Sequence, residues 1–271
     1  MPDHPLAAHT GAFRTAVGAA FPGERAVFRG RDLHAEVMHG TTFLQLCALA
    51  VGHELTADQA ALLDTVMVST SYPDARIWCN RVASLAGSTR STPTLALAAA
   101  HAAADARIYG RGNEHRAVAF LQRTLTAVRA GSDLDIALSE QIRTYGSLPG
   151  FGRPLHNGDE RIIPWMRAAR QYGAHDGDHV RLAFTIDERL KTSGKPLRMN
   201  AGGLVAAFGA DFGFTPRQWA IMLFPGFLAG MSPCYLEALE KPVGAVFAAR
   251  CDQVEYTGAP ARTWDRTPAR A

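Results

Sequence analysis

The stretch IYGRGNEH, residues 108–115, joins two long segments that both have helical character. The segment before it, residues 94–108, is almost entirely Ala and Leu around His101, which is too apolar for a surface helix and suits an internal one. A second helix is predicted after the stretch, over about residues 113–129. The turn therefore places a tyrosine, two glycines and several polar side chains at the start of a helix.

Periodicity and turn residues predict helix along most of the chain. Thr56 and Gln59 have the form of a capping box, and an apolar stripe over residues 62–67 follows on one face. Further helices are predicted at about residues 75–86, 133–144, 160–171, 177–191, 201–210 and 216–239. Alternating strand patterns are scarce, so the expected class is α-rich and globular.

Length and charge favour one compact globular protein over a series of small separate domains. A chain of 271 residues can bury a sizeable core, and its net charge of +3 with mixed signs indicates no nucleic-acid surface. The first residues lack the order of a signal peptide, and no apolar run approaches the roughly 18 residues of a membrane helix. We therefore expect a cytoplasmic protein without a membrane partner. The cysteines, Cys47, Cys79, Cys234 and Cys251, have no metal or dithiol spacing and are expected to be reduced, buried thiols.

Five segments, spread over most of the chain, match one enzyme family in order. They are FRGRDL at 28–33 with TFLQL at 42–46, GHELTA at 52–57, the turn at 108–115, GFGR at 150–153 with DER at 159–161, and YTG at 256–258 with Arg262. Together they resemble the citrate synthase and citryl-CoA lyase family, whose members carry Leu-His-Gly-Gly-Ala-Asn-Glu at the turn and Gly-Phe-Gly-His at the fourth segment.

The resemblance implies an all-α, citrate synthase-like fold. A large helical domain would comprise residues 1–109 and 201–271, with an inserted small helical domain at residues 110–200. It also implies a homodimer, and a cleft between the domains that takes an acyl-CoA and a keto or carboxylic acid. Coenzyme A thioester would be a substrate, and no permanently bound cofactor or metal is expected.

The catalytic letters of the family have changed in this chain. The family uses an Asp as base, one His to stabilise the enol and another to polarise the attacked carbonyl. By position, the enol-stabilising His falls on Tyr109, the carbonyl-binding His on Arg153 and, across a one-residue gap, the base on Asn200. Tyr109 can donate to an enolate oxygen, with a core tyrosine as the alternative, and Arg153 can stabilise an oxyanion. Asn cannot act as a base at neutral pH, so citrate synthesis itself is not expected.

Three residues are candidates to replace Asn200 as the base, namely His156, Glu114 and Asp211. His156 is the preferred candidate of the three because an unperturbed histidine titrates at about 6.5. The alternative interpretation is an exposed loop histidine.

Two substrate-binding positions have also lost their family residues. A His falls on Ser71 and a carboxylate-binding Arg on Phe227. Because an unpaired buried carboxylate costs several kcal/mol, we expect a second substrate less acidic than oxaloacetate. The substrate-binding residues that remain are Arg161, suited to a two-pronged carboxylate contact, Arg262, whose family counterpart can reach the partner's site, Asn113 and Glu114.

Two other motifs allow more than one interpretation. The glycine-rich segment 146–152 is either a coenzyme A phosphate loop or a tight connection. His175 and His179 have metal-ligand spacing, but a helix cap by Asp176 or Asp178 explains the same letters.

Two functions follow. The first is an enzyme that forms or cleaves a carbon–carbon bond next to a CoA thioester, as an acyltransferase or a citryl-CoA lyase-like lyase. The second is a catalytically inactive paralogue that binds acyl-CoA or a partner subunit. Polar substitutes at three catalytic positions favour the enzyme, because a decayed cleft could equally fill with apolar side chains.

Overall fold

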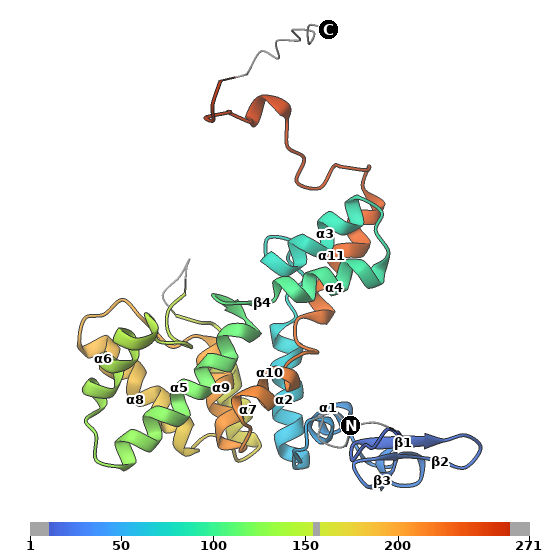
Figure 1. Cartoon of the computed structure of the whole chain (residues 1–271). Coiled ribbons are helices and arrows are strands. Elements are labelled where there is room, and N and C mark those ends of the chain that lie inside the picture. Colours follow the sequence, from blue (N-terminus) through green and yellow to red (C-terminus); the bar gives the residue numbers. More distant parts are fainter. Residues whose placement is uncertain (1–10, 154–157, 261–271) are drawn as a thin grey trace, which may run out of the picture.

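The computed structural model describes residues 11–153 and 158–260, and helices dominate them (Figure 1). The all-α prediction is confirmed. The helices are α1 (Phe43–Ala50), α2 (Ala57–Thr70), α3 (Trp78–Ser88), α4 (Pro93–Ala103), α5 (Arg111–Arg129), α6 (Leu134–Tyr145), α7 (Ile162–Gln171), α8 (Asp178–Thr192), α9 (Ala201–Asp211), α10 (Pro216–Met222) and α11 (Leu228–Glu240). A π-helical turn, η2 (Leu33–Val37), and a 3-10 turn, η3 (Cys251–Gln253), are also present.

Local caps fix several helix starts. The predicted capping box of α2 is present, since Gln59 N donates to Thr56 Oγ1 at 3.1 Å and Thr56 N donates to Gln59 Oε1 at 3.0 Å. The helices α1 and α10 begin with the same Thr and Gln arrangement, each box satisfying backbone N–H groups that a helix start leaves without partners.

The single helix predicted over residues 216–239 is wrong, because the chain forms α10 and α11 with a break between them. Pro225 disfavours helical geometry at Phe224, and Phe227 adopts a left-handed conformation with φ of 70°. The break turns Phe227 toward the start of α5, where its ring lies 6.0 Å from the Tyr109 ring.

The segment 94–108 also ends earlier than predicted. Helix α4 stops at Ala103, and strands β4 (Asp105–Ala106) and β5 (Tyr109–Gly110) form a small antiparallel hairpin before α5. Gly110 has φ of 66°, and a Cβ there would lie 2.1 Å from the carbonyl oxygen of Ala104. Only glycine fits this tight turn, which sets the position of Tyr109.

A three-stranded antiparallel sheet lies near the N-terminus and was not predicted. Its strands are β1 (Gly18–Phe21), β2 (Arg25–Phe28) and β3 (Arg31–Asp32), paired in that order. The strands are short and largely exposed, so they lack the buried alternation that marks a strand in a sequence.

Buried side chains form two clusters. The larger cluster contains side chains from α1, from α2 and from each of the helices α5 to α10, packed around Phe120, Trp165, Phe208 and Trp219. The smaller lies among α3, α4 and α11, which stand together in Figure 1. The proposed domain boundaries at residues 110 and 200 stay a prediction. No helix in the described part of the chain is long and apolar enough to cross a membrane.

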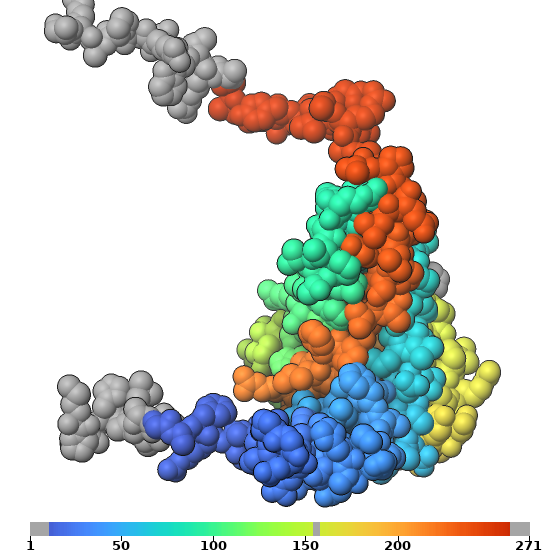
Figure 2. Space-filling model, turned by 90° about the vertical axis from the view of Figure 1, so that its right-hand side faces the viewer, coloured from blue at the N-terminus to red at the C-terminus, as the bar shows by residue number. Residues whose placement is uncertain are grey.

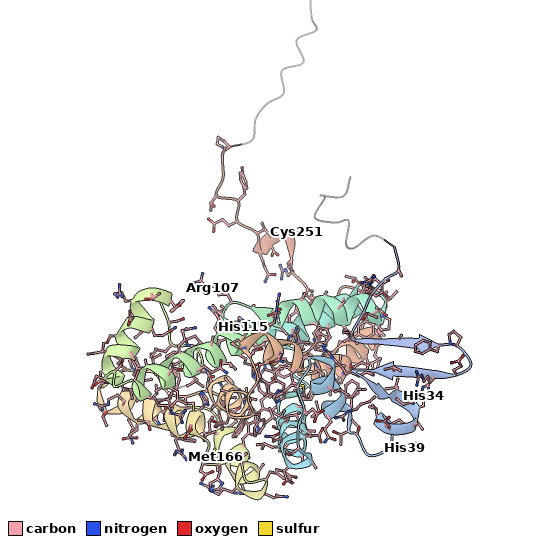
Figure 3. All side chains as sticks on the ribbon, turned by 60° about the horizontal axis from the view of Figure 1, so that its bottom comes forward. His34, His39, Arg107, His115, Met166 and Cys251 are labelled. Carbon is pink, nitrogen blue, oxygen red and sulfur yellow. The ribbon has the colours of Figure 1, made fainter. Side chains whose placement is uncertain are left out.

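The segment that follows α11 first contacts α3, where Gly244 N donates to Ser88 Oγ at 3.1 Å and the Phe247 ring lies 5.1 Å from the Arg81 guanidinium. Beyond these contacts it runs outward (Figures 1 and 2). It exposes large apolar side chains, namely Val243, Phe247, Val254 and Tyr256. Cys251 also lies on this segment and is exposed, which corrects the expectation that all four thiols are buried (Figure 3). Cys79 and Cys234 are buried as predicted, and Cys47 is partly buried.

Candidate active site

The site lies around the start of α9. Residues 198–200, which lead into α9, run alongside residues 150–152 and bond to them. Gly152 N donates to the carbonyl of Arg198 at 2.7 Å, and Asn200 N donates to the carbonyl of Gly150 at 3.0 Å. Gly150 has φ of 87°, and a Cβ there would lie 2.6 Å from Gly203 Cα. The glycine-rich segment is therefore a tight connection packed on α9. The N–H of Gly152 points into the protein, which argues against a phosphate loop at this residue.

Asn200 is the N-cap of α9, and both polar atoms of its side chain are bonded to backbone. Its Oδ1 accepts from Gly203 N at 3.1 Å, and its Nδ2 donates to the carbonyl of Gly152 at 2.7 Å. Each contact stabilises the pairing of the two segments. The catalytic role of Asn200 stays a prediction, but the contacts give this side chain a structural task.

Arg161 and Asp159 form a two-pronged ion pair next to these paired segments. Arg161 Nε donates to Asp159 Oδ1 at 2.8 Å and its Nη2 donates to Oδ2 at 2.8 Å. The carboxylate also accepts from Ala201 N at 2.8 Å. The Asp159 side chain is 0% exposed and that of Arg161 is 18% exposed. Burial opposes ionisation of Asp159, but Arg161 and the backbone donors hold its pKa below the ordinary value.

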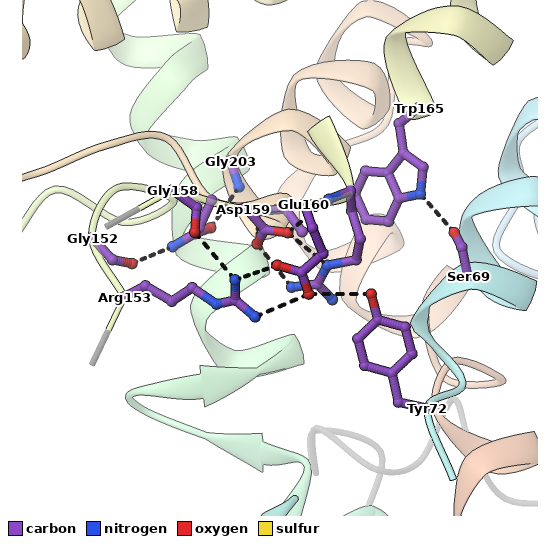
Figure 4. Close-up of polar contacts among 12 residues, drawn as sticks. Ser69, Tyr72, Gly152, Arg153, Gly158, Asp159, Glu160, Trp165 and Gly203 are labelled. Atoms are coloured by element: carbon purple, nitrogen blue, oxygen red, sulfur yellow. Dashed lines mark hydrogen bonds and ion pairs between the residues drawn. The ribbon is translucent and has the colours of Figure 1, made fainter. Parts of the chain in front are cut away.

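Arg153 points at a second carboxylate, Glu160, at the outer side of the site (Figure 4). Its Nη1 donates to Glu160 Oε2 at 2.6 Å and to the carbonyl of Gly158 at 3.1 Å. The hydroxyl of Tyr72 donates to Glu160 Oε1 at 3.3 Å. The hydrogen bond from Arg153 lowers the pKa of Glu160. Because the Glu160 side chain is 56% exposed, water screens this ion pair and its contribution to stability is modest.

Tyr109 lies among aromatic and sulfur groups. Its hydroxyl is 3.3 Å from Cys79 Sγ, and its ring centroid is 5.0 Å from that of Trp78 and 6.0 Å from that of Phe227. Burial, with a smaller contribution from Cys79, raises the pKa of Tyr109 above its ordinary value. Tyr109 is therefore a neutral hydrogen-bond donor throughout the physiological pH range.

A buried arginine, Arg111, supports the turn and was not selected from the sequence. It is 4% exposed, donates to the carbonyl and Nδ1 of His101 at 2.7 and 3.1 Å, and lies 5.1 Å from the Phe224 ring. Because a guanidinium only donates, His101 Nδ1 must be unprotonated. Burial and the Arg111 charge both lower the pKa of His101, which keeps this imidazole neutral.

Glu114 lies in the first turn of α5 and faces the start of α9. A Cβ built on Gly202 would lie 3.4 Å from Glu114 Cγ, 3.1 Å from Asn200 Oδ1 and 3.8 Å from Asn113 Nδ2. Burial raises the pKa of Glu114 to about 7, although the charges of Arg161 and Arg111 oppose the shift. This carboxyl is therefore partly ionised at neutral pH.

The other predicted residues have varied positions. Ser71 ends α2 and donates to the carbonyl of Met67 at 2.9 Å, while Phe227 begins α11. The structure brings five of the predicted residues close together, namely Tyr109, Asn113, Glu114, Arg161 and Asn200. Distances at Gly202 place Asn113, Glu114 and Asn200 side by side, and the charge of Arg161 is near enough to act on both Glu114 and Tyr109. His156 and Arg262 lie outside the described residues.

Asp211 caps a different helix. It accepts from the backbone N–H groups of His179 and Val180 at 2.8 and 3.0 Å, and from His179 Nδ1 at 2.8 Å. The start of α8 is therefore capped from the end of α9, and not by Asp176 or Asp178 as predicted. Within residues 11–153 and 158–260 no group of three His, Cys, Asp or Glu side chains could hold a metal.

Sequence reasoning missed the two acidic partners, Asp159 and Glu160, and also Tyr72. The sequence did contain a signal for the two acids. Asp159 and Glu160 directly precede Arg161, and two carboxylates next to an arginine predict ion pairs within the site. That they bond to Arg153, Tyr72 and α9 depends on tertiary contacts that the sequence does not display.

Comparison with known proteins identifies the fold. No family model matches the chain, and no curated protein matches it. The citryl-CoA lyase from Hydrogenobacter thermophilus is similar over 93% of this chain and 97% of that chain, with a TM-score of 0.77 and 23% identity. An ATP citrate lyase from Methanothrix soehngenii matches 92% of this chain with a TM-score of 0.71 and 13% identity, and 42% of that chain is covered.

A citrate synthase from Thermoplasma acidophilum is similar over 82% of this chain and 58% of that chain, with a TM-score of 0.63 and 16% identity. The resemblance found in the sequence is thus confirmed for the fold. The chain has the citrate synthase-like fold that citryl-CoA lyase and the citrate synthases share.

Proposed function

We propose that this protein is an acyl-CoA enzyme that forms or cleaves a carbon–carbon bond next to a thioester, and that citrate synthesis is not its reaction. The main support is the similarity to citryl-CoA lyase over nearly the whole of both chains. A fold alone hosts many functions, so the second support is a polar cluster in which Tyr109 and Glu114, at the turn that matches the family's catalytic turn, lie near Arg161. The substrates would be a coenzyme A thioester and a keto or carboxylic acid.

Tyr109 would stabilise the negative charge that develops on the thioester oxygen. Its raised pKa keeps the hydroxyl protonated, and its buried surroundings strengthen a hydrogen bond to an oxyanion. Arg153 would contact the second substrate after exchanging its exposed partner Glu160 for a substrate anion. Arg161 is already bonded to buried Asp159 and would act on the substrate mainly through its charge.

The second substrate is proposed to be less acidic than oxaloacetate. Phe227, where the family has a carboxylate-binding arginine, lies against Tyr109 and offers an apolar ring. A second substrate carboxylate there would lose its charge partner, at a cost of several kcal/mol when buried. A keto acid with one carboxylate, or a neutral carbonyl compound, fits these groups better.

The alternative function is a catalytically inactive paralogue that binds acyl-CoA or a partner subunit. The observation that favours it is the use of Asn200 as a helix cap, since both polar atoms of its side chain are bonded to backbone. Binding of coenzyme A without turnover would agree with this alternative.

Two further properties belong to the same proposal. A homodimer is supported by the apolar side chains exposed on the segment after α11, since exposed apolar surface of this kind commonly marks a protein interface. A cytoplasmic location fits the coenzyme A substrate and the free thiols.

Deuterium exchange at the α-carbon of acetyl-CoA and propionyl-CoA tests the proposed activity. We expect the wild type to incorporate deuterium in D₂O, and Tyr109→Phe to be slower by about 100-fold because one oxyanion donor is lost. Tyr145→Phe is the matched control, since Tyr145 is 52% exposed on α6 and should leave the rate unchanged. Equal rates for the wild type and Tyr109→Phe would refute the role of Tyr109.

A further inference from the structure

Asp159 and Glu160, in the segment before α7, and Asp211, at the end of α9, have definite partners. Asp159 is paired with Arg161, Glu160 is paired with Arg153, and Asp211 caps α8 from the far end of α9. The hydrogen bonds from Arg153 lower the pKa of Glu160, and, although burial opposes the shift, those from Arg161 and the backbone lower the pKa of Asp159. A carboxyl group that must take and release protons during turnover needs weaker hydrogen bonds and ion pairs than these.

Glu114 differs from these three carboxyl groups. Among the described residues it forms no ion pair and accepts no hydrogen bond, although it is only partly exposed. Its side chain extends from the first turn of α5 to within van der Waals reach of the start of α9, beside Asn200. Asn200 is the position that matches the family's base, so Glu114 lies next to the place where the missing carboxylate would stand.

The charged and titratable groups around Glu114 come from three directions. Arg111 lies on its own helix, Tyr109 lies on β5, and Arg161 precedes α7. At the start of α9 the neighbours Asn200 and Gly202 carry no charge. Two arginines favour the carboxylate and burial favours the acid, so the two forms are close in free energy at neutral pH.

We propose that Glu114 is the proton-transfer residue of this enzyme and takes over the task of the absent aspartate. The inference rests on the proposed function. The Glu114 carboxylate removes a proton from the α-carbon of the acyl-CoA. The electrons of the broken C–H bond form a C=C bond, and the electrons of the thioester C=O bond move to its oxygen, where Tyr109 donates a hydrogen bond. The products of the step are an enolate and a neutral Glu114, and reversal returns the proton to carbon.

Exchange at the α-carbon, measured against pH, tests this assignment. We expect the wild-type rate to rise through about pH 7 and then level off, because only the ionised carboxylate removes the proton. Glu114→Gln should lose about 100-fold to 10 000-fold, the usual contribution of a general base. Glu114→Asp should retain part of the activity, since a carboxylate remains within a shorter reach.

Glu140→Gln is the matched control, because Glu140 is exposed on α6 and pairs only with Arg143 among the described residues. Calorimetry with coenzyme A shows whether each variant still folds and binds. Infrared titration of the wild type, with Glu114→Gln as the reference, provides a readout that does not need activity. It should reveal a carboxyl that titrates near pH 7 and is absent from the variant.

The outcomes separate the two proposals. Exchange by the wild type that Glu114→Gln retains, or a wild-type profile that is flat through neutral pH, would overturn the role of Glu114 and leave the proposed function intact. A Glu114 carboxyl that titrates like an ordinary glutamate would also overturn it. No exchange by the wild type with either thioester would overturn the proposed function and the inference together.

Discussion

At the residue scale, two neighbouring side chains of the candidate site differ in their tasks. Asn200 holds the backbone together, and Glu114 has a pKa near neutral pH. The Asn200 amide joins two backbone segments, and such a cap contributes about 1 kcal/mol. Beside it, burial raises the pKa of Glu114, which has no ion-pair or hydrogen-bond partner among the described residues. A carboxyl group with a strongly shifted pKa is a common feature of functional sites, although structural networks also shift pKa values.

The raised pKa of Glu114 predicts a pH-dependent stability. Between the ordinary value of 4.5 and about 7, the folded protein holds a proton that the unfolded chain has released. The contribution to stability is therefore complete below the ordinary pKa and is lost as pH rises through about 7. It amounts to about 3 kcal/mol at most, since one pKa unit is about 1.4 kcal/mol.

Urea unfolding of the wild type and Glu114→Gln at several pH values measures this effect. We expect Glu114→Gln to gain stability relative to the wild type as pH rises from about 5 to about 8, because the variant has no carboxyl to ionise. The same comparison with Glu140→Gln should show no trend. A constant difference between Glu114→Gln and the wild type would mean that Glu114 titrates normally in the folded protein.

At the element scale, helix boundaries followed the sequence where their caps are local. Thr56 and Gln59 are three residues apart, so the start of α2 could be predicted from neighbouring letters. The cap of α8 comes from Asp211, a residue 32 positions from His179, and no local pattern contains that contact. The break before α11 did have a local signal in Pro225, which the predicted helix over residues 216–239 ignored.

The long-range cap of α8 gives a prediction about stability. Asp211→Ala removes the acceptor of two backbone N–H groups and of the His179 ring, and we expect a loss of about 2 kcal/mol. Asp176→Ala, at an exposed position of the same connection, should change stability by less than about 0.5 kcal/mol. Thermal or urea unfolding measures both. A larger loss for Asp176→Ala would restore the local cap that the sequence predicted.

At the scale of the whole molecule, the sequence predicted the fold through five short matches in family order, and comparison with solved structures agrees. The neighbourhood of Tyr109, Glu114 and Arg161 could also be expected from those matches. The ion pairs of Arg153 and Arg161 could not, because they depend on how the segment before α7 packs on α9. The pKa of Glu114 depends on burial, which is likewise a property of the folded chain.

The segment after α11 predicts how the chain associates. Its exposed apolar side chains would be covered in the proposed homodimer, and removal of residues 242–271 should therefore shift the protein to a monomer in analytical ultracentrifugation. The helices should still melt cooperatively, since the two buried clusters end before residue 242. If the truncated chain still sediments as a dimer, the interface lies elsewhere.

Deuterium incorporation into acetyl-CoA by the wild-type protein is the most direct test of the proposed chemistry. The reaction needs only the thioester, D₂O and a base at the candidate site, so it reports proton removal without knowledge of the second substrate. We expect incorporation at the α-carbon above the enzyme-free background, increasing with pH through about 7. Bound coenzyme A without any incorporation, from acetyl-CoA or propionyl-CoA, would contradict an enolising enzyme and leave the inactive paralogue as the function.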